Sequence, residues 1–200
     1  IKGVHNYHPR HLVQALDFVR GNRDRFPFAE LVEANGGIFG GCWCMGFHPP
    51  DDSHADDEMP NRLRKLDRVK AGTAHAALVF DGDECLGWCQ FGPPDELPRI
   101  KSRKEYEKGL VELPEWRIAC CYVGKGHRSK GVATAALRGA LDLIADLGGG
   151  RVEGYPEPAG AVPAGFLYNG ALSTYERAGF TKDRPIGKHR WVVTTTVAPA

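Results

Sequence analysis

The stretch from Trp116 to Leu137, WRIACCYVGKGHRSKGVATAAL, combines the residue types that bind phosphate. An apolar run leads into a glycine-containing loop, and an Ala/Leu-rich segment follows at once. Glycines let a backbone turn tightly and approach a ligand closely. The first amides of a helix have no internal partner, and the helix dipole is positive there. The sequence therefore predicts an anion site at Gly126–Thr134 that suits a pyrophosphate.

Two familiar nucleotide-binding loops fit this stretch badly. The Walker pattern, with Gly-Lys-Ser/Thr after a longer spacing, is absent. A dinucleotide-binding pattern that starts at Gly124 and Gly126 fails because Ser129 stands where its third glycine belongs. Arg128 and Lys130 add positive charge beside the loop. We therefore expect a diphosphate to bind here without base-reading groups.

Two blocks of the chain resemble one known family, the GNAT N-acetyltransferases. Arg128-Ser-Lys-Gly131-Val-Ala133 is similar to the acyl-CoA signature of that family, Arg/Gln-x-x-Gly-x-Gly/Ala, and it stands between a predicted buried strand and a long helix. Leu172-Ser-Thr-Tyr175-Glu-Arg-Ala-Gly179-Phe180 resembles the "LYEKxGF" helix end of the same family. The resemblance covers about Ala74 to Val197. It implies the GNAT fold and acetyl-CoA as the cofactor.

The resemblance also implies roles for the matching positions. The backbone of Cys121, Tyr122 and Val123 would pair with the pantetheine arm like an added strand. Tyr175 would donate a proton to the departing CoA thiolate, because the unperturbed pKa of a phenol, about 10, lies above that of a thiol. The loop amides would hold the pyrophosphate; they belong to Arg128, Ser129, Lys130, Gly131, Val132, Ala133 and Thr134.

The group that removes the proton of the attacking amine is less visible. Glu112 and Glu115 stand just before the buried strand, and Glu153 stands on the next one. We name Glu153 beside Tyr175 as a predicted catalytic residue. A relay through water would leave no need for a single base.

The cysteines raise an alternative, a zinc or redox sensor. Cys42 and Cys44 have even spacing on a predicted strand, as do Cys85 and Cys89, so each pair would share one face. Same-face residues of a strand stand about 6.5–7 Å apart, which is wide for a single zinc ion. We therefore predict no metal, and thiols that pack in the interior or line the acceptor cleft.

Composition bounds the class of protein. The 200 residues suit one domain, and the formal net charge is +1. The sequence has no long basic run of the kind that binds the phosphates of nucleic acid. No apolar stretch approaches the roughly 20 residues of a membrane helix, and no signal segment is expected at the start. The six cysteines, two of them adjacent at Cys120 and Cys121, lack a disulfide-framework spacing. We expect free thiols in a cytoplasmic protein, with these two on opposite faces of their strand.

Alternating strands and helices must hold these residues in place. Hydrophobic spacing predicts helices over His11–Arg20, Phe28–Ala34, Asn61–Lys70, Ser102–Leu110, Ser129–Leu147 and Tyr168–Ala178. It predicts strands over Ile38–Phe47, Ala74–Phe80, Glu84–Phe91, Trp116–Val123, Arg151–Tyr155, Phe180 onward and Arg190–Val197.

The fold class that follows is α/β (α+β), a central mixed and mostly antiparallel sheet of about six or seven strands with helices on both faces. We expect one domain over residues 1–200. Residues 1–72 would form its acceptor side, and residues 73–200 its acyl-CoA-binding core. The cofactor would enter where the strands Trp116–Val123 and Arg151–Tyr155 splay apart.

The predicted function is transfer of an acetyl group from acetyl-CoA to a primary amine, by direct attack in a ternary complex. The acceptor would be a small molecule or a peptide, and its identity cannot be read from the sequence. A homodimer is left open. The alternative class is a non-catalytic acyl-CoA-binding or regulatory module, which needs the loop and no acid.

Overall fold

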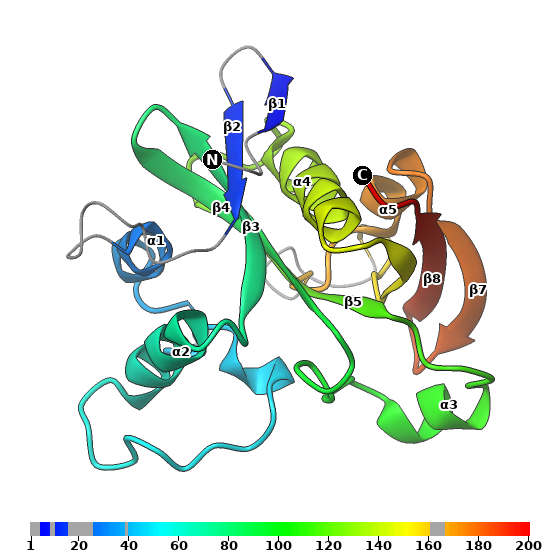
Figure 1. Ribbon diagram of the computed structural model, residues 1–200, viewed down its shortest axis with the longest axis horizontal. Coiled ribbons are helices and arrows are strands. Elements are labelled where there is room, and N and C mark those ends of the chain that lie inside the picture. The colour runs from blue at the N-terminus through cyan, green and yellow to red at the C-terminus, as the bar shows by residue number, and fades with distance from the viewer. Residues whose placement is uncertain (1–4, 9–10, 16–25, 39, 161–166) are drawn as a thin grey trace.

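One sheet organises the protein. The computed structural model describes residues 5–8, 11–15, 26–38, 40–160 and 167–200. Its 8-stranded sheet has the order β1-β2-β3-β4-β5-β6-β8-β7, and every pairing is antiparallel except that of β5 with β6 (Figure 1). The mixed, mostly antiparallel architecture is confirmed. The strands are β1 His5–His8, β2 His11–Ala15, β3 His75–Asp81, β4 Glu84–Gly92, β5 Trp116–Val123, β6 Gly150–Gly154, β7 Thr181–Ile186 and β8 Arg190–Val197.

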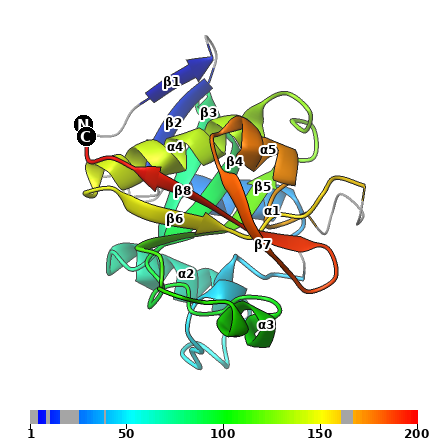
Figure 2. The ribbon, with the colours of Figure 1, turned by 90° about the vertical axis from the view of Figure 1, so that its right-hand side faces the viewer.

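Helices cover both faces of this sheet, as the sequence predicts (Figure 2). Side chains of β3 alternate between two hydrophobic clusters: Ala77 and Val79 pack with α4, whereas Leu78 and Phe80 pack with α1. Each large apolar side chain buried in this way contributes about 1.5–3 kcal/mol. The helices are α1 Pro27–Ala34, α2 Pro60–Lys70, α3 Arg103–Lys108, α4 Val132–Asp146 and α5 Leu172–Arg177. None of those in the described chain is long and apolar enough to cross a bilayer.

The predicted helix His11–Arg20 is wrong over its described part. His11–Ala15 is strand β2, and residues 16–20 lie outside the described residues. β2 pairs antiparallel with β3, with Leu12 opposite Phe80 and Ala15 opposite Ala77. Pairing with the edge of a sheet overrides the helical spacing of the apolar residues. The hairpin β1–β2 therefore extends the sheet beyond the strand number that the sequence predicts.

The predicted strand Ile38–Phe47 is also wrong. Its described residues, 38 and 40–47, form turns and a short 3-10 helix, Met45–Phe47, and residue 39 lies outside the described residues. Ile38, Trp43 and Cys44 adopt positive φ angles of 46°, 49° and 52°, which a strand does not allow. Glycines stand before the segment and within it, and they allow the chain to change direction there; they are Gly36, Gly37, Gly40, Gly41 and Gly46. We call residues 42–47 the cysteine turn.

Two β-bulges change which side chains share a face. On β4, Cys85 opposes Phe80 and Gly87 opposes Val79, so Leu86 is an extra residue. Cys85 consequently packs with α1, while Cys89 packs with α4 on the other face. The prediction that Cys85 and Cys89 share a face is therefore wrong, because a bulge shifts the two-residue period of a strand.

The second bulge lies in β5, where Cys120 opposes Gln90 and Ile118 opposes Phe91. Ala119 is the extra residue. After it, Cys120 packs on the α1 face and Cys121 against the α4 face, as predicted for two adjacent strand residues. The bulge thereby turns the Cys120 thiol toward the cysteine turn.

Candidate active site

The strands β5 and β6 diverge where the sequence predicts it. They pair only from Trp116 to Ile118, which lies opposite Gly154. β5 continues to Val123, so its second half has no strand partner on the side that β6 has left. The loop that follows leads directly into α4. Free strand edge and helix start together form one wall of a cleft.

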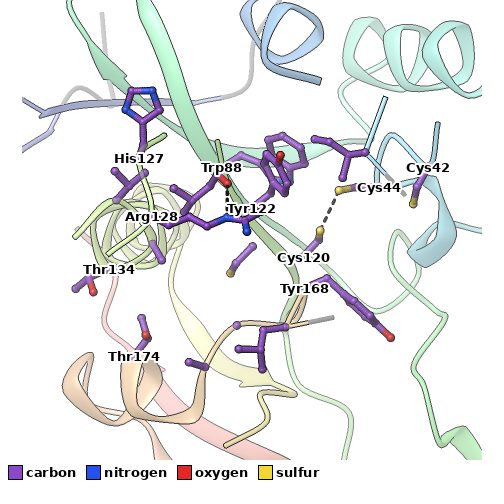
Figure 3. A pocket seen from close by; sticks show the side chains of 18 of the residues that line it. Cys42, Cys44, Trp88, Cys120, Tyr122, His127, Arg128, Thr134, Tyr168 and Thr174 are labelled. Carbon is purple, nitrogen blue, oxygen red and sulfur yellow. Dashed lines mark hydrogen bonds between the residues drawn. The ribbon is translucent and has the colours of Figure 1, made fainter. Parts of the chain in front are cut away.

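This cleft has a volume of about 1150 Å³, slightly above the range of typical ligand sites, roughly 300–1,000 Å³. One end lies at the start of α4 and at α5, where Thr134 and Thr174 stand (Figure 3). The other end lies between the cysteine turn and β5. Its described lining carries cationic side chains and no carboxylate; the cations belong to Arg99, Lys101, Arg128 and Arg177.

The start of α4 has the features of an anion site. Gly131 is the N-cap residue, with φ +83°, and it has no side chain that could satisfy the first helix amides. The amides of Val132, Ala133 and Thr134 precede the first helical hydrogen bond, which Ala135 N–H donates to Gly131 O at 2.9 Å. Ser129 also adopts a positive φ, 60°, a costly backbone state that tends to mark functional loops.

Nine of the ten predicted cofactor-binding residues line the cleft. They are Cys121, Tyr122, Val123, Arg128, Ser129, Gly131, Val132, Ala133 and Thr134. Lys130 is exposed and is not among the lining residues. The Arg128 guanidinium donates from Nε to Val123 O at 3.4 Å, and it thereby links the loop to the free strand edge.

The free edge of β5 offers fewer backbone groups than the sequence predicts. Cys121 N–H already donates to Tyr168 O at 2.6 Å, from the loop before α5. Because main-chain groups alternate along a strand, Val123 faces the same open edge, whereas Tyr122 faces β4 and pairs with Trp88. The side chains of Tyr122 and Trp88 stack at 4.8 Å between ring centroids. Pairing of the cofactor's pantetheine arm with the backbone of Val123 stays a prediction. Tyr122 would line the cleft with its ring and would not offer its backbone to the arm.

Tyr175 lies behind the cleft wall. Its side chain is 1% exposed and is not among the described lining residues. The hydroxyl donates to Asn169 O at 2.9 Å and also contacts the Cys121 thiol. Burial, followed by the nearby Cys121 and Cys89 thiols, raises the pKa of Tyr175 well above its usual value. The phenol therefore keeps its proton, and Cys121 separates it from the cleft.

Glu153 lies away from the cleft, in a buried polar cluster. Its Oε2 accepts hydrogen bonds from the hydroxyls of Tyr106, at 2.9 Å, and Tyr155, at 3.2 Å. Its Oε1 accepts from Arg151 at 2.8 Å. The carboxylate is fully buried, and none of these contacts opens into the cleft. The prediction that Glu153 acts as the base consequently has no geometric support.

We expect Glu153→Gln to act on stability. Removing the charge that Arg151, Tyr106 and Tyr155 contact should lower the free energy of unfolding by about 2–3 kcal/mol. Turnover per folded molecule should stay unchanged. Urea unfolding and an initial-rate assay check this, with the exposed Glu112→Gln as the control. Loss of turnover in a stably folded Glu153→Gln protein would restore the base role.

A buried polar network supports the cysteine turn. His48 follows the turn, is fully buried, and donates from Nδ1 to Glu96 O at 3.1 Å. Its Nε2 then accepts from Lys65 Nζ at 2.9 Å and from the Gln90 amide at 2.8 Å. Burial, together with the charges of Lys65 and Arg68, lowers the pKa of His48 to about 2. The network thus needs His48 neutral.

This neutral His48 predicts a dependence of stability on pH. In the unfolded chain His48 is protonated with a pKa near 6.5, whereas in the folded protein it stays neutral down to about pH 2. Stability from this residue is therefore complete above pH 6.5 and is lost as the pH falls below it. Between pH 7.5 and pH 5.0, urea unfolding should show a loss about 2 kcal/mol larger in the wild type than in His48→Gln. Equal losses in the two proteins would contradict the neutral assignment.

The sequence matches the family model of the acetyltransferase (GNAT) family over residues 42–180. Because the match spans well over half of the chain, the protein belongs to the GNAT family. The class of protein that fold and family define is therefore an acetyltransferase. No curated protein matches the chain.

Solved structures agree on the fold. A GNAT-family protein from Desulfovibrio desulfuricans has a TM-score of 0.56 at 15% identity, with 94% of this chain and 99% of that chain covered. A protein from Salmonella typhimurium, solved with its cofactor acetyl-CoA, has a TM-score of 0.54 at 13% identity, with 94% of each chain covered. The ribosomal-protein-S5-alanine acetyltransferase from Vibrio fischeri has a TM-score of 0.51 at 12% identity, covering 97% and 96%.

The sequence only partly anticipated the residues at the other end of the cleft: it allowed a thiol such as Cys44 to line a cleft, but it did not single out Phe47 or Tyr168. Trp43, Cys44 and Phe47 come from the cysteine turn, and Tyr168 comes from the loop before α5. The sequence pattern predicted a strand for the first three and a helix for the fourth. The four cysteines of the zinc hypothesis also separate: within the described residues, no group of three His, Cys, Asp or Glu side chains is arranged to hold a metal.

Proposed function

We propose that this protein transfers an acetyl group from acetyl-CoA to a primary amine by direct attack, with both reactants bound in the cleft. The single observation that carries the proposal is the continuity of the cleft. It runs from the uncapped amides of α4, along the free edge of β5, to the cysteine turn. A long cofactor can lie along this path and leave its acyl end beside a second binding region.

The start of α4 suits a diphosphate. Gly131 leaves three amides unsatisfied at the positive end of a 15-residue helix, and Arg128 adds a charge beside them. The cofactor is acetyl-CoA in this proposal, in line with the family and with the bound cofactor of the Salmonella protein. When bound, acetyl-CoA supplies the acyl group and a thiolate leaving group.

Catalysis in this scheme depends first on proximity. Holding amine and acyl group in one cleft replaces an encounter in solution by a reaction within a complex. We assign Tyr175 as the acid that protonates the leaving sulfur, with Cys121 on the path between its hydroxyl and the cleft. The described lining offers no carboxylate as a base, so we assign the proton of the amine to water.

The acceptor is an amine of a small molecule or a peptide. The Vibrio fischeri protein acts on alanine of a ribosomal protein, which makes peptide amines worth including. Aromatic and thiol side chains form the acceptor end here, with Tyr168 beside Phe47 at 6.1 Å between ring centroids.

The test is an assay of CoA release over a broad panel of amines and peptide N-termini. We expect amine-dependent release that requires acetyl-CoA. Tight acetyl-CoA binding with no release over the whole panel would overturn the catalytic proposal and favour a non-catalytic acyl-CoA-binding module.

A further inference from the structure

Two thiols face one another at the acceptor end of the cleft. Cys44 belongs to the cysteine turn and Cys120 to β5, and their Sγ atoms lie 3.0 Å apart (Figure 3). Both residues line the cleft, although each is only 5% exposed. The sulfur atoms are thus reachable by a small molecule in the cleft and shielded from large ones. The β5 bulge at Ala119 and the left-handed backbone of Cys44 produce this pairing.

The surroundings of the pair favour a thiolate at Cys44. The Trp88 indole is 1% exposed, its Nε1 has no hydrogen-bond partner in the described chain, and it lowers the pKa of the Cys44 thiol. Burial alone raises the pKa of Cys44, but the Cys120 hydrogen bond, the Lys65 charge and the Trp88 indole hold it below the usual value. The same hydrogen bond and burial raise the pKa of Cys120 well above its usual value, so Cys120 is the less acidic thiol of the pair.

Lys65 is a buried amine that forms no direct ion pair with a carboxylate of the described residues, although the Glu96 carboxylate is near enough to act on its pKa. It is 2% exposed, and its Nζ donates to the neutral His48 at 2.9 Å and lies 5.9 Å from the centroid of the Phe28 ring. Burial lowers the pKa of Lys65, and the Cys44 thiol is the first of the groups that oppose this. A buried charge is costly unless an opposite charge accompanies it. A thiolate at Cys44 would supply one, because Cys44 is the largest of the charged groups that oppose the effect of burial on Lys65.

We propose that Cys44 and Cys120 form a reactive dithiol that a small hydroperoxide converts to a disulfide. The Cys44 thiolate attacks one oxygen of hydrogen peroxide, the O–O bond breaks, and hydroxide leaves, so that Cys44 becomes a sulfenic acid. The Cys120 sulfur then attacks the Cys44 sulfur, the S–O bond breaks, and the departing hydroxide takes the Cys120 proton. Peroxide is reduced to two water molecules and two thiols are oxidised to one disulfide, which ties the cysteine turn to β5.

A second close pair provides an internal comparison. Cys89 and Cys121 lie 3.4 Å apart, but Cys89 is fully buried on the α4 face. Burial, with the neighbouring Cys121, raises the pKa of Cys89 well above its usual value. Cys85 has a pKa raised to about 12 by burial. Because both pKa values are raised, Cys89 and Cys85 are not expected to attack a peroxide.

The experiment treats the reduced wild-type protein with one equivalent of hydrogen peroxide at pH 7 and maps the disulfide by peptide mass spectrometry. We expect loss of two free thiols and a linked Cys44–Cys120 peptide pair. Cys44→Ser and Cys120→Ser should each lose this product, whereas Cys85→Ser should keep it.

Lys65→Met should slow alkylation of Cys44 by iodoacetamide at least about tenfold. Glutathione disulfide, which is far larger, should react much more slowly than peroxide.

If a variant fails to fold, the disulfide map of the oxidised wild-type protein alone tests the proposal. A product linking Cys89 to Cys121, a disulfide between two molecules, or six thiols that survive the treatment would each overturn the proposal. Because the readout is a disulfide and not acyl transfer, its failure would leave the proposed function untouched.

Discussion

Replacing Gly131 by Asp together with Arg128 by Glu is expected to weaken binding of acetyl-CoA at least about 100-fold. The two changes place carboxylates at the uncapped start of α4 and beside it, where we expect the diphosphate. Each lost charge-assisted hydrogen bond is worth about 1.5–3 kcal/mol, and the new repulsion adds to that. A change of about 3 kcal/mol corresponds to roughly 100-fold in affinity. Isothermal titration calorimetry with acetyl-CoA measures it.

The matched control is Gly131→Asn with Arg128→Gln, which keeps size and removes the added charge. Asn tolerates the left-handed backbone that Gly131 adopts, at φ +83°. A Cβ at this position meets no atom within 4 Å, so packing is not disturbed. We expect a loss of affinity below about tenfold for this pair, since the helix amides remain. Wild-type affinity in the Asp/Glu protein would refute the loop as the diphosphate site.

Tyr175→Phe is expected to lower kcat about 100-fold and to spare affinity for acetyl-CoA. A positioned general acid contributes about 10²–10⁴ to a rate. The hydroxyl that is removed donates to Asn169 O, behind the cleft wall, so the binding surface stays as it is. Initial rates over a range of acetyl-CoA concentrations separate kcat from KM.

A purely structural effect of Tyr175→Phe needs its own control. The change leaves the buried Asn169 carbonyl without this donor, at a cost of about 1–3 kcal/mol in stability. Tyr106→Phe removes a comparable buried hydroxyl, which donates to Glu153 at 2.9 Å away from the cleft. We expect a similar loss of stability and unchanged kcat in Tyr106→Phe. If both variants keep wild-type kcat, Tyr175 is not the acid.

Local sequence signals were sufficient where a strand or helix is bounded by turn residues and packs against the main sheet. β5 and β8 span Trp116–Val123 and Arg190–Val197 as predicted, and the Asp81-Gly82-Asp83 turn marks the β3–β4 hairpin. The glycine-containing loop before α4 was equally readable as a loop that leads into a helix, and its role in binding the cofactor stays a prediction.

The end of the cleft at the cysteine turn could not be read from the sequence, because distant segments meet there. The pattern of Ile38–Phe47 matches a strand, but positive φ angles at Trp43 and Cys44 turn the segment across β5. The pairing of Cys44 with Cys120 also depends on the bulge at Ala119. A bulge has no signal in residue spacing, and it changes every side-chain direction beyond it.

A crystal structure of the protein with coenzyme A tests the central claim most directly. We predict the diphosphate within hydrogen-bond distance of the amides of Val132, Ala133 and Thr134, with the pantetheine arm along the Val123 edge of β5. A diphosphate bound at any other place, with the start of α4 left to solvent, would contradict the account.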